Sequence, residues 1–254
     1  MTVNRILPCL DIDNRKVVKG KNFLGVKEIA DPLSLAKKYV ADGADELVFY
    51  DISASVQNRG MFLDLIAEIA AEVPIPFIVG GGIRAVTDIE AALNAGADKV
   101  SINSAALHNP ELIHEAATRF GSERIILSMD VRRTGDGAWH VFAQAGMENS
   151  GVDAIEWAKV GARLGAGEIV VNSIDEDGVK EGYDLQLTKT IAEAVDIPVI
   201  ASGGAGKMEH FQEAFTEGKA AGALAASVFH FNEINLNDLK TFLVNDSVAD
   251  KVDV

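Results

Sequence analysis

Short apolar runs alternate along this chain with longer segments in which apolar residues recur at helical spacing. This alternation is typical of successive βα units on a parallel sheet. Eight units can be drawn, with strands that begin near Ile6, Glu46, Phe77, Lys99, Ile125, Glu168, Val199 and Ala223. Eight βα units favour a closed α/β barrel, the (βα)8 or TIM barrel. A doubly wound open sheet is the alternative, but its usual glycine fingerprint does not follow the first strand.

Two predicted helices begin with the same kind of residue pair. Asp31-Pro32 and Asn109-Pro110 each place a side chain that can cap a helix directly before a proline. Proline is favoured at the first helical position, where the backbone N–H has no helical partner in any case. We therefore expect helices that begin at Pro32 and Pro110.

The order of landmarks in the first half of the chain returns in the second half. The matching segments are residues 6–11 and 125–130, residues 43–48 and 165–170, and residues 75–82 and 197–204. The last two pairs lie 122 residues apart, far more than the roughly 20–50 residues of a solenoid repeat. We expect one domain over residues 1–254, built from half-barrels at about 1–122 and 123–245 and ending in a short C-terminal tail.

Acidic residues outnumber basic ones by 38 to 23, and the net charge is −15. A surface of this sign repels nucleic acid and anionic lipid, so neither is an expected partner. The single cysteine, Cys9, excludes an internal disulfide, and the N-terminus lacks the basic and then apolar pattern of a signal peptide. We expect a cytoplasmic protein that needs neither a metal nor another cofactor.

An aspartate ends the first predicted strand of each half, Asp11 in the first and Asp130 in the second. In a parallel barrel this end of the strands forms the active face, and strands one and five lie opposite each other. Two facing carboxylates suit general acid/base catalysis, in which one donates a proton and the other accepts one. A lone aspartate here would more often cap the following loop, but two at duplicated positions favour catalysis.

Glycine-rich turns at residues 80–82 and 202–206 each lie between a strand and a helix. Glycine there allows backbone N–H groups to approach an anion at a helix N-terminus. The next strand of each half ends in small residues, at 103–105 and 225–227. The duplicated pattern predicts a ligand with a phosphate at each end.

Four charged residues stand at strand starts, on the face remote from the carboxylates: Arg5, Glu46, Lys99 and Glu168. Side chains alternate along a strand, so all four are expected to point into the barrel. The same parity brings the small side chains of Cys9, Ser101 and Ser128 into the bore. Two interpretations stay open: a charge ring that stabilises the bottom of the barrel, and a plugged tunnel for a small molecule.

Several motifs are specific enough to compare with known families: PCLD at 8–11, VVKG at 17–20, FYDISAS at 49–55, VGGGIR at 79–84, GADKVSINSAA at 96–106, DEDG at 175–178 and ASGGAGK at 201–207. Over essentially the whole chain they resemble the cyclase-subunit family of imidazole glycerol phosphate synthase. The phosphoribosylformimino aminoimidazole carboxamide ribotide isomerase family of the same histidine pathway shares the duplicated barrel and paired aspartates. It is expected to lack the VVKG and KVSIN segments, so the cyclase family is favoured.

The resemblance implies a lyase of histidine biosynthesis that works in a heterodimer with a glutaminase subunit. Ammonia from the glutaminase would attack phosphoribulosyl-formimino aminoimidazole carboxamide ribonucleotide. The products would be imidazole glycerol phosphate and aminoimidazole carboxamide ribonucleotide. This substrate carries a phosphate at each end, as the two glycine turns predict.

The resemblance also assigns roles to single residues, with Asp11 and Asp130 as the acid/base pair. Lys19 would lie on a mobile loop after strand one. The other expected substrate-binding residues are the pocket carboxylates Asp51 and Asp177, one phosphate site at Gly82, Asn103 and Ser104, another at Gly178, Gly204 and Ser227, and Asn172, Ser202 and Ala226 beside them. The gate for ammonia would be Arg5, Glu46, Lys99 and Glu168, and Asp98 would lie on the face that docks the glutaminase.

Three departures from the family pattern cluster around the predicted pocket. Residues 143–148 read AQAGME where the family has a threonine, small polar residues and a basic loop. Asn172 and Ile78 each stand where a threonine is usual. The departures in the second half support a third hypothesis, in which the barrel serves mainly as a scaffold that binds and activates a glutaminase.

Overall fold

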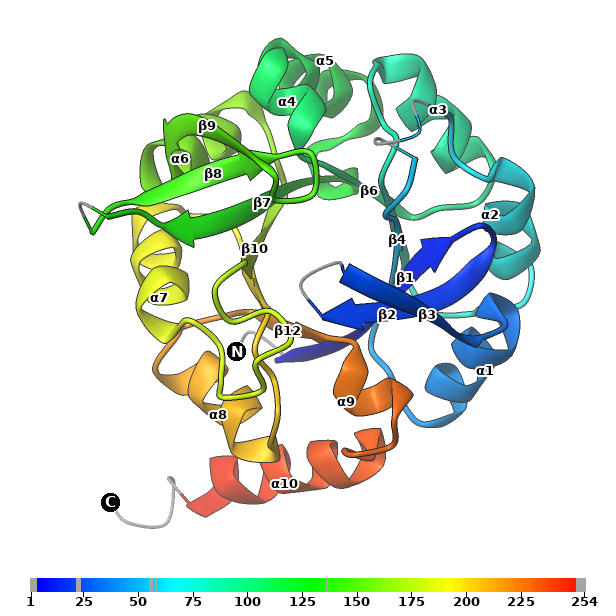
Figure 1. The fold of residues 1–254 in the computed structure, drawn as a ribbon, viewed down its shortest axis with the longest axis vertical. Helices are drawn as coiled ribbons and strands as arrows, with labels where there is room; N and C mark the ends of the chain where they lie inside the picture. The colour runs from blue at the N-terminus through cyan, green and yellow to red at the C-terminus, as the bar shows by residue number, and fades with distance from the viewer. Residues whose placement is uncertain (1–3, 22–23, 55–56, 58, 136, 250–254) are drawn as a thin grey trace.

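The computed structural model describes residues 4–249 except 22–23, 55–56, 58 and 136. Within these residues, eight parallel strands pair in the order β1-β4-β5-β6-β7-β10-β11-β12, and β12 pairs with β1 to close the ring (Figure 1). They are β1 Arg5–Asp13, β4 Leu47–Asp51, β5 Phe77–Gly80, β6 Lys99–Ile102, β7 Ile125–Arg133, β10 Glu168–Ser173, β11 Val199–Ser202 and β12 Gly222–Ala225. The predicted (βα)8 barrel is confirmed, with every strand beginning within one residue of its expected start.

Helices surround the strand ring (Figure 1). They are α1 Pro32–Ala41, α2 Leu63–Ala70, α3 Val86–Asn94, α4 Ser104–His108, α5 Glu111–Phe120, α6 Ala154–Leu164, α7 Leu185–Ala194, α8 Met208–Thr216, α9 Ser227–His230 and α10 Leu236–Ala249, with a single 3-10 turn at Ser122–Arg124. In the part of the chain that the structure describes, no helix is both long and apolar enough to cross a bilayer.

One of the two predicted helix starts is confirmed. Asp31 caps α1 by accepting a hydrogen bond from the Ser34 backbone N–H at 2.9 Å, a contact worth about 1 kcal/mol. The other start is shifted, because Pro110 precedes α5 as its cap and the helix begins one residue later. Asn109 contributes its backbone carbonyl, which accepts from the N–H of Leu112 at 3.1 Å.

The stretch expected to be a loose C-terminal tail from residue 246 begins in a helix. Helix α10 continues to Ala249, and residues 250–254 lie outside the described part of the chain.

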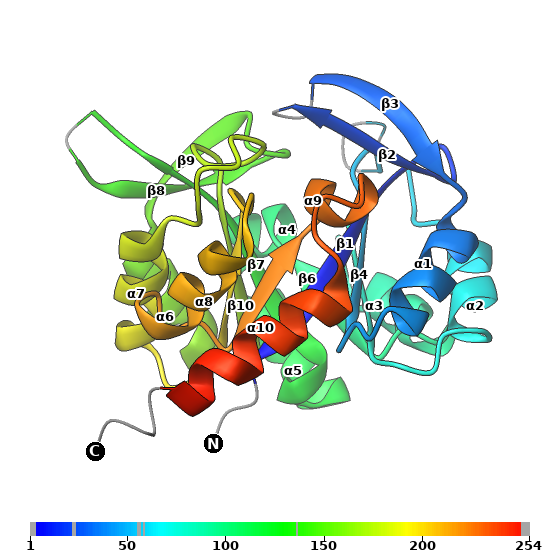
Figure 2. The ribbon, with the colours of Figure 1, turned by 90° about the horizontal axis from the view of Figure 1, so that it is seen from below.

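Two antiparallel hairpins that the sequence did not predict extend the barrel above its mouth (Figure 2). Strand β1 continues beyond Asp11 into a hairpin with β2 Lys16–Lys21 and β3 Leu24–Ala30, and β7 continues beyond Asp130 into one with β8 Trp139–Ala143 and β9 Glu148–Asp153. The expectation that both strands end at their aspartate is therefore wrong, because each strand keeps a pairing partner past that point. Lys19 accordingly lies in strand β2, not in a loop.

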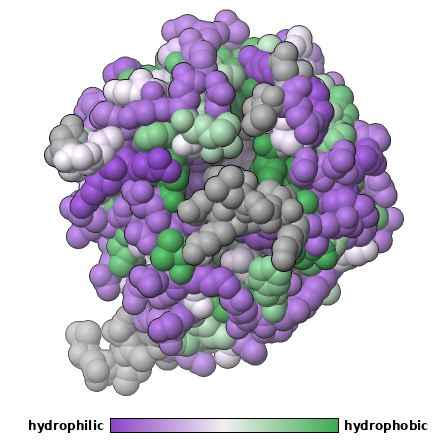
Figure 3. All heavy atoms as spheres, viewed as in Figure 1, coloured by the Kyte–Doolittle hydropathy of each residue, from purple (hydrophilic) through white to green (hydrophobic). Residues whose placement is uncertain are grey.

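Alternation along the strands separates two apolar cores. Even-numbered residues of β1, such as Ile6 and Leu10, pack outward against the helices. The odd-numbered residues Leu7 and Cys9 of β1 face inward. There they join inward-facing residues of the other strands in a smaller cluster: Val48, Ile78, Ile126, Val170, Ile200 and Leu224. This inner cluster fills the bore with branched side chains, as in other barrels of this kind. Above it, hydrophilic side chains dominate the face around the mouth (Figure 3).

Candidate active site

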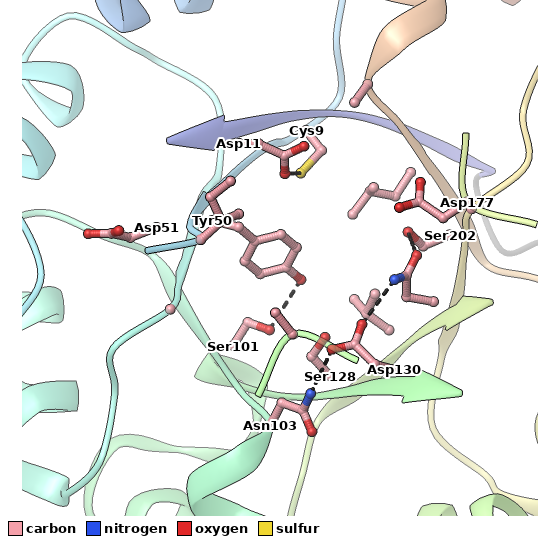
Figure 4. Close-up of a pocket in the computed structure, with 18 of the residues that line it drawn as sticks. Cys9, Asp11, Tyr50, Asp51, Ser101, Asn103, Ser128, Asp130, Asp177 and Ser202 are labelled. Atoms are coloured by element: carbon pink, nitrogen blue, oxygen red, sulfur yellow. Dashed lines mark hydrogen bonds between the residues drawn. The ribbon is translucent and has the colours of Figure 1, made fainter. Parts of the chain in front are cut away.

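A pocket opens at the carboxyl ends of the barrel strands (Figure 4). Every predicted catalytic and substrate-binding residue lines it: Asp11, Lys19, Asp51, Gly82, Asn103, Ser104, Asp130, Asn172, Asp177, Gly178, Ser202, Gly204, Ala226 and Ser227. These residues are spread over the chain from Asp11 to Ser227, and closure of the barrel brings them together. In the FYDISAS motif, Ser55 lies outside the described residues.

Asp11 is held in an ion pair on one side of the pocket. The Lys19 ammonium donates to Asp11 Oδ2 at 2.8 Å, and the Cys9 thiol lies 3.8 Å from Oδ1. Burial opposes the charge on Lys19, but Asp11 and then Asp177 outweigh it, so the pKa of Lys19 is raised. Burial, followed by the charge of Asp11, raises the pKa of Cys9. Lys19 is thus a protonated donor, and Cys9 stays a neutral thiol.

Asp130, on the opposite side, is held by two carboxamides. Asn172 Nδ2 donates to Oδ1 at 2.9 Å, and Asn103 Nδ2 donates to Oδ2 at 3.0 Å. The Ser202 hydroxyl donates to Asn172 Oδ1 at 3.0 Å, which fixes the orientation of that amide. Burial raises the pKa of Asp130 to about 6, and the hydrogen bond from Asn172 opposes the rise.

The two aspartates therefore have different surroundings. Asp11 is paired with a cation, whereas neutral amide groups donate to Asp130, and burial raises the pKa of Asp130 to about 6. Strands β1 and β7 are the first and fifth of the ring, so the two carboxyl groups face the pocket from opposite sides (Figure 4). A pair of carboxyl groups with separated properties is suited to moving a proton across a bound ligand.

Asp51 lies at the pocket edge, and its carboxylate points away from the centre (Figure 4). The Arg59 guanidinium donates two hydrogen bonds, of 2.6 and 2.7 Å, to the Asp51 carboxylate. The Ala54 backbone N–H donates to the same carboxylate at 3.1 Å. The guanidinium of Arg59 also lies 4.0 Å from the centre of the Phe62 ring. Asp51 thus anchors the segment that follows β4.

That anchored segment supports the first glycine turn. Gly81 and Gly82 both have positive φ, +88° and +73°. A Cβ on Gly81 would collide with the backbone carbonyl of Asp51, and a Cβ on Gly82 would lie 2.7 Å from Cβ of Ala54. Side chains are therefore excluded from this turn for two reasons, backbone conformation and space.

The second glycine turn is held differently. Gly203 and Gly204 also have positive φ, +90° and +105°. The Gly182 backbone N–H donates to the carbonyl of Gly204 at 2.9 Å, and a Cβ on Gly204 would collide with the Gly182 carbonyl. The two turns lie across the ring from each other, since β5 and β6 face β11 and β12.

At the other end of the barrel, the four predicted charges form a closed ring. Arg5 contacts Glu46 at 2.6 Å and Glu168 at 2.9 Å, and Lys99 contacts the same two carboxylates at 3.1 and 3.3 Å. Burial lowers the pKa of Arg5, but Glu168 and Glu46 outweigh it, so the net shift is upward. All four side chains are at most one-fifth exposed. Asp98, just before β6, is exposed, and one of its oxygens accepts from the backbone N–H of Phe77 at 2.9 Å.

Sequence reasoning missed three residues in or beside the pocket: Tyr50 lines it, and Arg59 and Gln144 contact residues that line it. Tyr50 could have been found, because it has the inward parity of Glu46 and Val48 on the same strand. Gln144 could not, since its partner Ser104 is distant in sequence. Arg59 is close to its partner Asp51 along the chain, but residues 52–59 show no sequence pattern that predicts the contact. Gln144 lies in the turn between β8 and β9, and its backbone N–H donates to Ser104 Oγ at 3.0 Å. Among the described residues, no group of three or more His, Cys, Asp or Glu side chains could hold a metal ion.

Comparison with known proteins agrees with this site. Residues 5–235 match the histidine biosynthesis protein family. Imidazole glycerol phosphate synthase subunit HisF of Oceanobacillus iheyensis is 55% identical over 249 residues, which cover 98% of this chain and 98% of the relative. The relative carries the name of the synthase subunit, so the isomerase alternative is not retained. The chain therefore belongs to the histidine biosynthesis protein family, in the group of cyclase subunits of imidazole glycerol phosphate synthase.

Proposed function

We propose that this cyclase subunit closes the imidazole ring with ammonia that a glutaminase subunit delivers. The substrate would be phosphoribulosyl-formimino aminoimidazole carboxamide ribonucleotide, and the products imidazole glycerol phosphate and aminoimidazole carboxamide ribonucleotide. The observation that carries the proposal is the arrangement of Asp11 and Asp130 on opposite sides of one pocket, between two glycine turns.

The glycine turns support binding of a ligand with two phosphates in a strongly acidic protein. Backbone N–H groups act over a few ångströms, where the net charge of −15 matters little. We place one phosphate near Gly82 and Ser104, and the other near Gly204 and Ser227. Gln144 donates to Ser104 Oγ, which leaves the hydroxyl hydrogen of Ser104 free to donate to a phosphate oxygen.

The two sides of the pocket would have different parts in the reaction. Asp130 has a pKa of about 6, so at neutral pH it is mostly ionised and still basic enough to take a proton from the attacking ammonia nitrogen. On the other side, the protonated Lys19 beside Asp11 can stabilise the oxygen of the carbonyl group under attack.

Ammonia would enter through the ring of Arg5, Glu46, Lys99 and Glu168, with the glutaminase docked over that end of the barrel and in contact with Asp98. The side chains above the ring are apolar, which favours the passage of a neutral molecule over ammonium. The proposal also keeps a single domain of two half-barrels. The buried, unpaired Cys9 is consistent with a reducing cytoplasm.

The scaffold hypothesis is not favoured by the departures that suggested it. Asn172, in place of the usual threonine, still donates a hydrogen bond to Asp130. Residues 143–148 form the end of β8, the turn that contacts Ser104, and the first residue of β9. The pocket therefore keeps its polar contacts around both the carboxylate and the first glycine turn.

The test is ring closure by the purified chain, supplied with the bisphosphate substrate and an excess of ammonium salt. We expect both products to form in equal amounts, and we expect Asp11→Asn to form neither at a comparable rate. Absence of product from the wild-type chain would contradict the proposal. So would conversion of the aldose precursor to the ketose without ammonia, which is the isomerase reaction.

A further inference from the structure

Tyr50 projects into the centre of the barrel, at the floor of the pocket (Figure 4). It pairs with Asp11 on β1 and with Gly80 on β5, and its ring packs on the inner apolar cluster. A Cβ on Gly80 would lie 2.6 and 2.7 Å from two ring carbons of Tyr50. Gly80 has an ordinary φ, so the absence of a side chain there serves to make room for this ring.

The floor separates two different regions of the bore. Below Tyr50, the inner cluster presents apolar side chains such as Leu7, Val48 and Ile78. Above Tyr50 lie the ionisable side chains of the pocket, Asp130 among them. A molecule that travels from the charged ring to the carboxylates leaves an apolar region at the level of Tyr50.

Three hydroxyl groups meet at this level. The Tyr50 hydroxyl lies 3.2 Å from Ser101 Oγ, and Ser101 is only 4% exposed. Ser128, on β7, lines the same part of the pocket. Burial raises the pKa of Tyr50 well above neutral, so its hydroxyl remains a donor. Each hydroxyl can donate one hydrogen bond and accept two. The contact between Tyr50 and Ser101 uses only part of this number, so further hydrogen bonds to a small molecule in the pocket can form.

We propose that Tyr50, together with Ser101 and Ser128, forms a binding site for neutral ammonia between the apolar bore and Asp130. The inference rests on the proposed function, since it needs ammonia as a reactant. It goes further by assigning the place where the nucleophile waits before attack.

The chemistry of the three groups selects ammonia over ammonium. Tyr50 donates to the nitrogen lone pair, which ammonium lacks, and the serine oxygens accept N–H hydrogens. Ammonium is further opposed by the apolar cluster below, which offers no compensation for its lost hydration. Attack on the substrate requires only that the single hydrogen bond from Tyr50 breaks, after which Asp130 can accept the proton.

The experiment compares Tyr50→Phe with wild type in the ammonium-salt reaction, with the bisphosphate substrate saturating. The variant keeps the ring over Gly80 and removes only the hydroxyl. We expect the KM for ammonia to rise about 3- to 10-fold, the effect of one neutral hydrogen bond. The KM for the bisphosphate should stay unchanged. Ser101→Ala should act in the same direction.

Tyr183→Phe is the matched control, because the Tyr183 hydroxyl is also buried but donates to the backbone carbonyl of Leu224 at 3.1 Å. A general effect of losing a buried hydroxyl would raise the KM for ammonia equally in both tyrosine variants, and this result would overturn the ammonia site. So would a Tyr50→Phe enzyme with the wild-type dependence on ammonia. If wild type itself forms no product with ammonium salt, the proposed function fails, and the ammonia site fails with it.

Discussion

The hydrogen bond from Asn172 lowers the pKa of Asp130, which burial raises, and replacing Asn172 tests the acid/base assignment directly. The Asn172 amide donates to Asp130 Oδ1 at 2.9 Å and is itself oriented by Ser202 at 3.0 Å. Asn172→Leu removes this donor and fills nearly the same volume, so that water does not replace it. Asn103 then remains as the carboxamide that donates to Asp130.

The size of the effect follows from the hydrogen bond that is lost. A hydrogen bond to a charged group contributes about 1.5–3 kcal/mol, and one pKa unit corresponds to about 1.4 kcal/mol. The pKa of Asp130, about 6 in the wild type, should therefore rise by about 1–2 units. A higher pKa means that the proton stays bound up to a higher pH. If Asp130 acts as the base, the acid side of the rate profile must move to higher pH by the same amount.

The assay is the rate of ring closure from about pH 5 to about pH 9, with the concentration of neutral ammonia held constant. This range extends to both sides of the Asp130 pKa of about 6. Asn172→Thr is the control, because a hydroxyl can restore a donor, and its profile should lie between those of the wild type and Asn172→Leu. Ser202→Ala should give a smaller shift in the same direction. An acid limb that stays in place in Asn172→Leu, at whatever absolute rate, would refute the assignment of Asp130 as the base.

Four further substitutions test the remaining parts of the site. Asp11→Asn and Asp130→Asn should each lower turnover with ammonium salt by about 10²–10⁴ while the unfolding transition stays cooperative; a near-wild-type rate in either contradicts its role. Arg59→Met should release Asp51 and the first glycine turn, and so raise the KM for the bisphosphate while the KM for ammonia stays unchanged; equal changes in both would indicate a general loss of structure. Lys99→Ala, measured with the glutaminase present, should lower the product formed per glutamine consumed and spare the ammonium-salt reaction, whereas an unchanged ratio would leave the charge ring a stabilising role only.

The burial of the charge ring at the bottom of the barrel bears on its two interpretations, a stabilising ring and an ammonia gate. The sequence placed Arg5, Glu46, Lys99 and Glu168 at the bottom of the barrel but carried no information on their exposure. Their side chains prove to be at most one-fifth exposed and paired in a closed circuit. Removing one member of a buried pair costs about 3–5 kcal/mol, so Lys99→Ala should also be visibly less stable, and only the product ratio separates the two roles.

The sequence by itself determined the barrel strands and the residues at their ends. Each strand is a short apolar run with polar boundaries, and this pattern is local, so it can be read without knowledge of the fold. Parallel strands all run in one direction, so residues at the ends of different strands necessarily meet at one face. Asp11, Asp130 and the two glycine turns were identifiable for this reason, and the duplication of the chain gave each a second copy for comparison.

Only the tertiary structure decided which side chains contact each other. The register between strands, once the ring closes, brings Asn103 and Asn172 to Asp130 and places the ring of Tyr50 over Gly80. The two hairpins were also invisible in the sequence, because β2, β3, β8 and β9 mix polar and apolar residues without a clear period of two. These features arise from pairing between distant residues, and the local pattern of a sequence does not encode the distances on which such contacts depend.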